Sequence, residues 1–193
     1  MATALDIAGQ SVWLIPFADR LRPDTAEALA RLKAMDIDAS ILSGDNGAAV
    51  AQAARATGLF AQSSASPIDK LDTILRMKHA GHRVLMVGDG LNDGPSLAAA
   101  HVSASPSTAA DVSQNVANVV YQGRLLWPVV ELLVTARRAR GVMRENIGFS
   151  IAYNAIMLPL AVAGFVTPWL AAAAMSGSSL VVMGNSFRVG GRR

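Results

Sequence analysis

Two carboxylates in a glycine-rich stretch give the strongest chemical signal in the sequence. Asp89 and Asp93 lie four residues apart in Gly88-Asp89-Gly90-Leu91-Asn92-Asp93, directly after the apolar run 83–87. Glycine lets the backbone turn tightly, and converging oxygen ligands suit Mg²⁺ that is held partly by waters and a phosphate group. We therefore predict that Asp89 and Asp93 bind Mg²⁺.

Two other stretches carry groups suited to a phosphoryl group. Ser43-Gly44-Asp45 places a hydroxyl and backbone amides after an apolar run, where a phosphoryl oxygen can be held. Lys70, in Pro67-Ile68-Asp69-Lys70, stands at the start of an expected helix and is suited to neutralising a transferring phosphoryl group. Each stretch alone also fits an ordinary turn or a solvated lysine, but the three in this order indicate a phosphoryl-transfer site.

The elements that must position these groups alternate between strand and helix. Apolar runs predict strands, each followed by a loop, and periodic stretches predict helices between them. The expected strands are Val12–Phe17, Asp38–Leu42, Arg83–Val87, Val102–Ala104 and Val116–Tyr121; the expected helices open at Arg22-Pro23-Asp24 or cover Ala48–Thr57, Ile68–Ala80 and Leu97–Ala100. This alternation predicts an α/β fold with a doubly wound parallel sheet, whose ligands bind beyond the carboxyl ends of the strands.

A long uncharged segment distinguishes the last part of the chain. Residues 146–187 contain no Asp, Glu, Lys or Arg, and arginines flank them on both sides. The length divides into two spans of about 20 residues, which predicts a transmembrane hairpin with both ends in the cytoplasm. A buried helical hairpin in a soluble core is the alternative. The net charge of +3 comes from arginines beside this segment, so it does not indicate a nucleic-acid-binding face.

Composition and charge also suggest how the chain is divided. The sequence contains no cysteine, which excludes a disulfide scaffold, a Cys metal site and a thiol nucleophile. The expected parts are a cytoplasmic α/β region (1–123), a basic stalk (124–145), the hairpin (146–187) and a basic cytoplasmic tail (188–193). Together they predict a multi-pass protein of the cell (inner) membrane, in contact with lipid.

The order SGDN, PxxK and MVGDGLND resembles the second half of the phosphorylation domain of P-type ATPases, which has a haloacid-dehalogenase-like fold. The resemblance implies Mg²⁺ as cofactor and ATP as substrate of the intact pump. It also implies catalytic roles for seven positions: Ser43, Gly44, Asp45, Lys70, Asp89, Asn92 and Asp93. Gly94 stands where the family usually has alanine.

The uncharged segment is similar to the last two helices of copper-transporting heavy-metal ATPases. The resemblance implies that a Tyr-Asn pair and a Met-x-x-Ser-Ser motif lie along the ion path, namely Tyr153, Asn154, Met175, Ser178 and Ser179. A thioether suits Cu(I), although membrane methionines and small residues also serve packing. Residues around His101 and Asp111 resemble the subgroup that serves cytochrome oxidase assembly, often called FixI or CcoI.

The sequence covers only part of the family's pattern. No Asp-Lys-Thr-Gly-Thr occurs, so the phosphorylated aspartate is not in this chain, and we expect the chain to need the missing N-terminal part of the pump and to be inactive alone. Three alternatives stay open: a divalent-metal or potassium pump, a membrane-tethered haloacid-dehalogenase-like phosphatase, and a non-catalytic partner subunit. The phosphatase would need a DxD nucleophile, but Asp19 is followed by Arg20 and Leu21.

Overall fold

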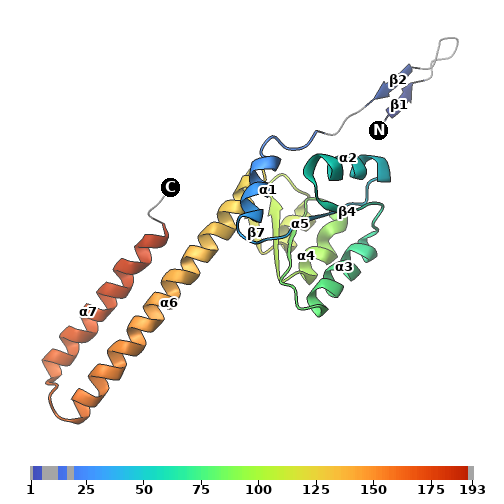
Figure 1. Ribbon diagram of the computed structural model, residues 1–193. Helices are drawn as coiled ribbons and strands as arrows, with labels where there is room; N and C mark the ends of the chain where they lie inside the picture. Colours follow the sequence, from blue (N-terminus) through green and yellow to red (C-terminus); the bar gives the residue numbers. More distant parts are fainter. Residues whose placement is uncertain (1, 6–12, 17–19, 191–193) are drawn as a thin grey trace. The chain divides into compact units, whose positions relative to one another are not determined.

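The computed structural model describes residues 2–5, 13–16 and 20–190. The chain forms two compact units, Met1–Val130 and Glu131–Arg193 (Figure 1). Val12, Phe17 and Asp19, which entered the sequence-based predictions, lie outside the described residues, as do residues 191–193.

Parallel strands form the centre of the first unit. β3 (Ser40–Leu42) pairs with β4 (Phe60–Gln62), and β5 (Leu85–Val87), β6 (Val102–Pro106) and β7 (Val119–Tyr121) form a second sheet in that order. All three pairings are parallel, with Leu42 opposite Gln62 and Val87 opposite Ala104. Parallel pairing needs a crossover between strands, which the intervening helices supply. The predicted parallel α/β class is therefore confirmed.

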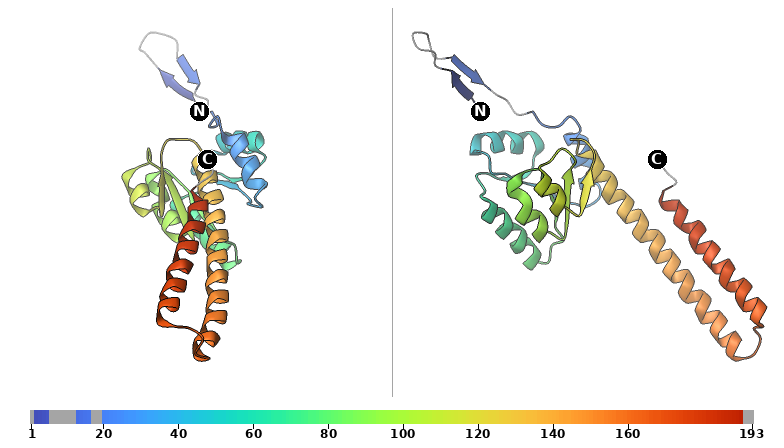
Figure 2. Two further views of the ribbon diagram at one scale, coloured as in Figure 1. Left: turned by 90° about the vertical axis from the view of Figure 1, so that its left-hand side faces the viewer. Right: turned by 180° about the vertical axis from the view of Figure 1, so that it is seen from behind.

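Helices follow the strands (Figure 2), and the sequence pattern predicts each of them except the one at Asp111–Val116. Pro67 opens one of these helices, as proline commonly does in a first turn, and Gly58 ends another in the left-handed conformation that favours glycine. The core gathers around Ile74, Met86 and Leu97, which are at least nine-tenths buried. The helices are α1 (Thr25–Lys33), α2 (Gly47–Thr57), α3 (Pro67–His79), α4 (Gly94–Ala99) and α5 (Asp111–Val116), with the short 3₁₀ turn η1 (Leu91–Asp93) before α4.

Two strand assignments depart from the expectation. The strand expected at Val12–Phe17 appears as β2 (Trp13–Pro16), but it pairs antiparallel with β1 (Ala2–Leu5) and joins neither parallel sheet. The sequence analysis also missed β4, because three residues ending in glutamine show no apolar alternation. Its hydrogen bonds with β3, a distant segment, make it a strand.

The second unit is a helix pair. α6 (Trp127–Val162) begins in the first unit and continues through the second, and α7 (Pro168–Ser186) follows after a short turn and leads into η2 (Phe187–Val189). Among the described residues, one helical segment, Pro168–Val189, is long and apolar enough to cross a membrane, and none of it is buried.

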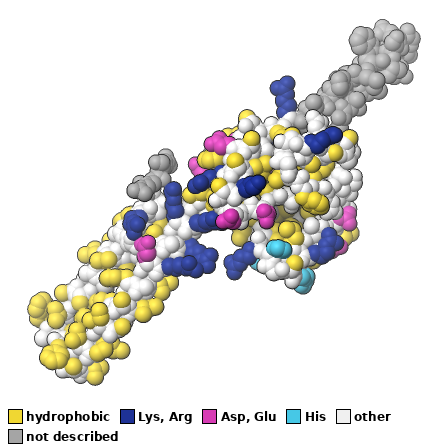
Figure 3. Space-filling view, viewed as in Figure 1, with side chains coloured by type: hydrophobic (Ala, Val, Ile, Leu, Met, Phe, Trp, Pro, Cys, Tyr) yellow, Lys and Arg dark blue, Asp and Glu magenta, His cyan; other side chains and the backbone are white. Residues whose placement is uncertain are grey.

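The prediction of two spans is thus supported only for the second. After the last charge, Glu145, α6 has 17 residues, fewer than the approximately 20 that a bilayer needs, and Asn146, Tyr153 and Asn154 are among them. Figure 3 shows hydrophobic side chains crowding the end of the pair where α6 and α7 are joined.

Candidate active site

A buried ion pair lies at the centre of the candidate site. Lys70 Nζ donates to Asp93 Oδ1 at 2.7 Å, and each side chain is only 11% exposed. Lys70 comes from the first turn of α3 and Asp93 from the end of η1, so the pair joins two of the three predicted motifs. Burial strengthens this attraction relative to water, and the lysine is held in one place.

The start of α3 is fixed by a capping box. Ser66 Oγ accepts from the Asp69 backbone N–H, and the Asp69 carboxylate accepts from the Ser66 backbone N–H at 2.9 Å and from its hydroxyl at 2.7 Å. These bonds from Ser66 hold the pKa of Asp69 below its ordinary value, and Arg76 adds a smaller contribution. The capping box therefore sets where α3 begins and, with it, the position of Lys70.

The glycine-rich loop holds Asp93 from the other side. Gly90 N–H donates to Asp93 Oδ2 at 3.2 Å, and the Ser113 hydroxyl donates to the Gly90 carbonyl. A Cβ atom on Gly88 would lie 3.0 Å from Asp93 Oδ2, so a side chain at this position would force the carboxylate to shift by a few tenths of an ångström. Both Asp93 oxygens thus have partners within the protein, and this geometry favours a role for Asp93 in holding Lys70.

Asp89 is placed quite differently from Asp93. Its side chain is 62% exposed, and its nearest ion-pair partner is Arg22, whose Nη2 lies 3.5 Å from Oδ2. The Asp89 carbonyl accepts from Ala110 N–H, which fixes the backbone while the carboxylate faces solvent. Asn92, in η1, is exposed as well. Asp89 therefore offers the hard, accessible oxygen that Mg²⁺ prefers.

The Ser43 loop forms hydrogen bonds within itself and with the residue before the cap of α3. Ser43 Oγ donates to Asp45 Oδ2 at 2.9 Å and accepts from Asp45 N–H at 3.1 Å. The Ser43 carbonyl accepts from Ala65 N–H at 2.9 Å, and Ala65 immediately precedes the cap of α3. A Cβ on Gly44 would lie 3.4 Å from the Ala65 carbonyl oxygen, so the two segments pack closely.

Hydrogen bonds therefore connect the three motifs in series. The Ser43 loop joins the cap of α3, α3 carries Lys70, and Lys70 joins Asp93 in the glycine-rich loop. Within residues 2–5, 13–16 and 20–190, no group of three or more His, Asp or Glu side chains could hold a metal. An Mg²⁺ ion at Asp89 would take its other ligands from water and phosphate oxygens, which fits this ion's reluctance to lose its waters.

The residues expected along the ion path bond mainly within their own helices. Ser178 Oγ and Ser179 Oγ donate to the Met175 carbonyl at 2.8 and 3.0 Å. Asn154 Nδ2 donates to the Ser150 carbonyl, and the Met175 side chain is 68% exposed. In the described part of the chain, no hydrogen bond joins Tyr153 or Asn154 of α6 to the serines of α7, and the assignment of these residues to the ion path stays a prediction.

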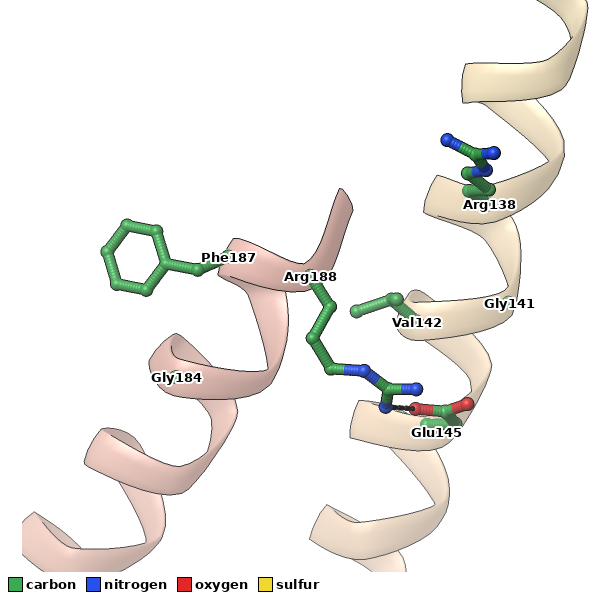
Figure 4. A pocket seen from close by; sticks show the side chains of 7 residues that line it. All are labelled: Arg138, Gly141, Val142, Glu145, Gly184, Phe187 and Arg188. Atoms are coloured by element: carbon green, nitrogen blue, oxygen red, sulfur yellow. Dashed lines mark hydrogen bonds and ion pairs between the residues drawn. The ribbon is translucent and has the colours of Figure 1, made fainter. Parts of the chain in front are cut away.

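A polar network instead joins the two helices at the other end of the pair. Arg188 Nη1 lies 2.9 Å from Glu145 Oε2, and Asn185 Nδ2 donates to Asn146 Oδ1 at 2.9 Å. Arg188 and Glu145 border a cavity of about 620 Å³, in which Arg188 reaches across to α6 (Figure 4). The network fixes the register of the pair. It was not predicted, because nothing in the sequence indicates which α6 residues face Arg188.

Two residues near the site were missed by the sequence analysis. Arg22 reaches Asp89, and Asp24 accepts hydrogen bonds from Leu126 and Trp127 at the start of α6. Both belong to a stretch that was interpreted only as the opening of α1. No sequence pattern connects residue 24 with residue 126, so only the fold could reveal this contact.

Comparison with known proteins gives consistent results. A family model described as haloacid dehalogenase-like hydrolase matches residues 2–101. The chain is 51% identical over 169 residues to the nitrogen fixation protein FixI of Bradyrhizobium diazoefficiens, and 30% identical over 188 residues to the copper-exporting P-type ATPase of Bacillus subtilis. These alignments cover 87% and 96% of this chain but 23% of each relative. The chain therefore spans about a quarter of these relatives.

Solved structures point the same way. The crystal structure of a zinc-transporting PIB-type ATPase in the E2.Pi state matches 92% of this chain and 29% of its own, with a TM-score of 0.82 and 29% identity. The match extends across most of the chain, so it covers more than the parallel sheet alone. The resemblance to heavy-metal P-type ATPases that the sequence motifs indicated is confirmed.

Proposed function

The chain belongs to the haloacid dehalogenase-like hydrolase family, and we propose that it forms part of an ATP-driven heavy-metal cation pump. In this proposal the first unit supplies groups that support an aspartyl phosphate, and the helix pair supplies part of the ion path. The buried Lys70–Asp93 pair next to the exposed Asp89 is the observation that carries the proposal. A lysine fixed in this way neutralises charge on a transferring phosphoryl group without having to reorganise.

The roles of the individual residues follow from their surroundings. Asp89 would hold Mg²⁺, which supplies Lewis-acid stabilisation of the phosphoryl oxygens when bound. The backbone at Gly44 and the Ser43 hydroxyl would bind a phosphoryl oxygen, and the hydroxyl would turn its single proton to that oxygen from Asp45 Oδ2, which lies 2.9 Å away in this structure. Asp93 would act by positioning Lys70, and the binding of Mg²⁺ by Asp93 itself stays a prediction. The phosphorylated aspartate would come from another part of the pump.

We propose Cu(I) as the transported ion. The charge-free stretch 146–187 offers a thioether at Met175 and no carboxylate, and a soft ligand without negative charge suits a monovalent soft cation. One relative is a copper-exporting P-type ATPase, and another is the nitrogen fixation protein FixI. The similarity to a zinc-transporting ATPase keeps a divalent ion as the second candidate. Two membrane crossings with both ends cytoplasmic are part of this proposal.

A chimera tests the phosphoryl-transfer role. This chain would replace the matching stretch of the B. subtilis copper exporter, and phosphoenzyme would be measured from radiolabelled ATP. We expect the chimera to form phosphoenzyme, Asp89→Asn to abolish it, and the isolated 193-residue chain to show no ATP turnover. Asp72→Ala, which removes an exposed carboxylate on α3, is the matched control. Normal phosphorylation of Asp89→Asn would remove the Mg²⁺ role.

The choice of ion is tested on the same chimera. Met175→Leu keeps the size and apolar character of the side chain but removes the sulfur. We expect Cu(I)-stimulated phosphorylation to fall while the amount of inserted protein stays unchanged. Met183→Leu, on the same helix, is the control. Stimulation by Zn²⁺ but not by Cu(I) in the unmodified chimera would favour the divalent alternative.

A further inference from the structure

Asp24 occupies the N-cap position of one helix but caps a different one. It immediately precedes α1, where an aspartate usually accepts a hydrogen bond from its own helix, yet its side chain makes no such bond. Instead, Asp24 Oδ2 accepts from the backbone N–H groups of Leu126 and Trp127, each at 2.7 Å. All three residues belong to the first unit.

The helix that Asp24 caps is α6. The first N–H groups of a helix have no partner within it, and a carboxylate there satisfies them and interacts favourably with the helix dipole. α6 runs without a break for 36 residues, from Trp127 to Val162. One side chain, from a segment about a hundred residues earlier, therefore holds the first turn of α6 to the rest of the first unit.

The same short segment reaches the candidate magnesium carboxylate. Arg22, two residues before Asp24, places Nη2 3.5 Å from Asp89 Oδ2. Pro23, between them, has a restricted φ angle that limits how far the two neighbours can move independently. The segment Arg22-Pro23-Asp24 thus contacts the Asp89 loop with one residue and the start of α6 with another.

Only one oxygen of the Asp24 carboxylate accepts the hydrogen bonds of the cap. Its second oxygen, Oδ1, is buried and has no hydrogen-bond partner within the described residues. A buried, unpaired carboxylate oxygen costs free energy. The two 2.7 Å hydrogen bonds to the other oxygen, and the position of the carboxylate at a helix N-terminus, offset this cost.

We propose that Asp24 is a positioning residue that couples events at the Asp89 loop to the start of α6. The inference rests on the proposed pump function and extends it, because it names the contact through which the first unit sets the position of the first turn of α6. The hydrogen-bonded cap makes the first turn of α6 follow the 22–24 segment. Without the cap, phosphoenzyme still forms, but the movement of the 22–24 segment is passed less effectively to the first turn of α6.

The test separates coupling from simple stabilisation. In the chimera described above, both phosphoenzyme formation and metal transported per ATP hydrolysed would be measured for Asp24→Ala and Asp24→Asn. We expect Asp24→Ala to keep phosphoenzyme near the unmodified level but to lower transport per ATP by roughly 2- to 30-fold. Asp24→Asn keeps an acceptor oxygen and should restore most of the coupling. Glu27→Ala, an exposed residue of α1, is the control.

The possible outcomes are distinct. Unchanged transport per ATP in Asp24→Ala, or an equal loss of phosphoenzyme and transport, refutes the coupling role while leaving the pump function in place. An unmodified chimera that forms no phosphoenzyme refutes the proposed function, and the inference with it. If Asp24→Ala does not accumulate, Asp24→Gly removes the same acceptor, and amide exchange at Leu126 and Trp127 must then accelerate in Asp24→Gly but not in Asp24→Asn.

Discussion

The Lys70–Asp93 pair makes a quantitative prediction possible. At 2.7 Å and an effective dielectric constant of about 20, Coulomb's law gives roughly 6 kcal/mol of attraction before the cost of dehydrating both ions is subtracted. Because each side chain is only 11% exposed, removing one partner leaves a buried charge without its counter-ion. We therefore expect Asp93→Ala to lower the free energy of unfolding by about 3–5 kcal/mol.

The two partners should not contribute equally. Lys70→Met leaves Asp93 with the hydrogen bond from Gly90 N–H, so its cost should be smaller, about 1–3 kcal/mol. The double variant Lys70→Met/Asp93→Ala removes both charges and leaves neither ion unpaired. Its cost should therefore be less than the sum of the single costs, with a coupling energy of about 1–3 kcal/mol.

The measurement is urea unfolding of the whole chain in detergent micelles. Trp127 fluorescence would report on the first unit once Trp13 and Trp169 are replaced by phenylalanine. Asp72→Ala serves as the control for loss of an exposed carboxylate. If the two single costs add to the double cost within about 0.5 kcal/mol, the pair does not act as a unit, and the structural basis for a fixed Lys70 is refuted.

Two further predictions concern the surroundings of this pair. Gly88→Ala places a Cβ 3.0 Å from Asp93 Oδ2, so it should displace Asp93 and lower the free energy of unfolding by about 1–3 kcal/mol. Gly47→Ala is the control and should cost much less, because its Cβ meets Ser63 Oγ at 3.6 Å. Equal losses of stability in the two variants would contradict this account. Hydrogen bonds from Ser66 lower the pKa of Asp69 in the folded state. The stability that ionised Asp69 contributes is therefore complete above its unfolded pKa of about 3.9, and it is lost as pH falls through the lower pKa of the folded state. Ser66→Ala should raise the Asp69 pKa toward the unfolded value in a carboxyl NMR titration, and an unchanged titration would show that Ser66 is not the cause.

The sequence allowed the parallel α/β class and helices α1 to α4 to be predicted because each depends on local patterns, whereas α5 was missed. Pro67 and the glycines after the helices mark boundaries that the backbone itself requires. β4 and the pairing of β2 could not be found in this way, because both depend on hydrogen bonds to another strand. The order of the three motifs indicated which residues belong to the site, but not how each one is used.

Asp89 and Asp93 illustrate this difference well. In the sequence they are equivalent carboxylates four residues apart, and both were assigned to Mg²⁺. The fold separates them through burial: Asp93 is enclosed with Lys70, whereas Asp89 faces solvent. Which carboxylate meets a lysine depends on the position of α3, whose Lys70 lies 23 residues before Asp93. Spacing along the chain carries no information about that contact.

The hydroxyls of α7 show how a helix can be self-sufficient and still offer ligands. Ser178 and Ser179 each donate their proton to the Met175 carbonyl, so neither of these two hydroxyl donors is left unpaired if this helix lies in lipid. Donation directs the hydrogen toward the helix backbone and leaves lone pairs on both oxygens. A cation can therefore approach these oxygens without breaking either bond. The proposed ion path thus requires no unfolding of α7, only neighbouring groups that complete the coordination begun by Met175.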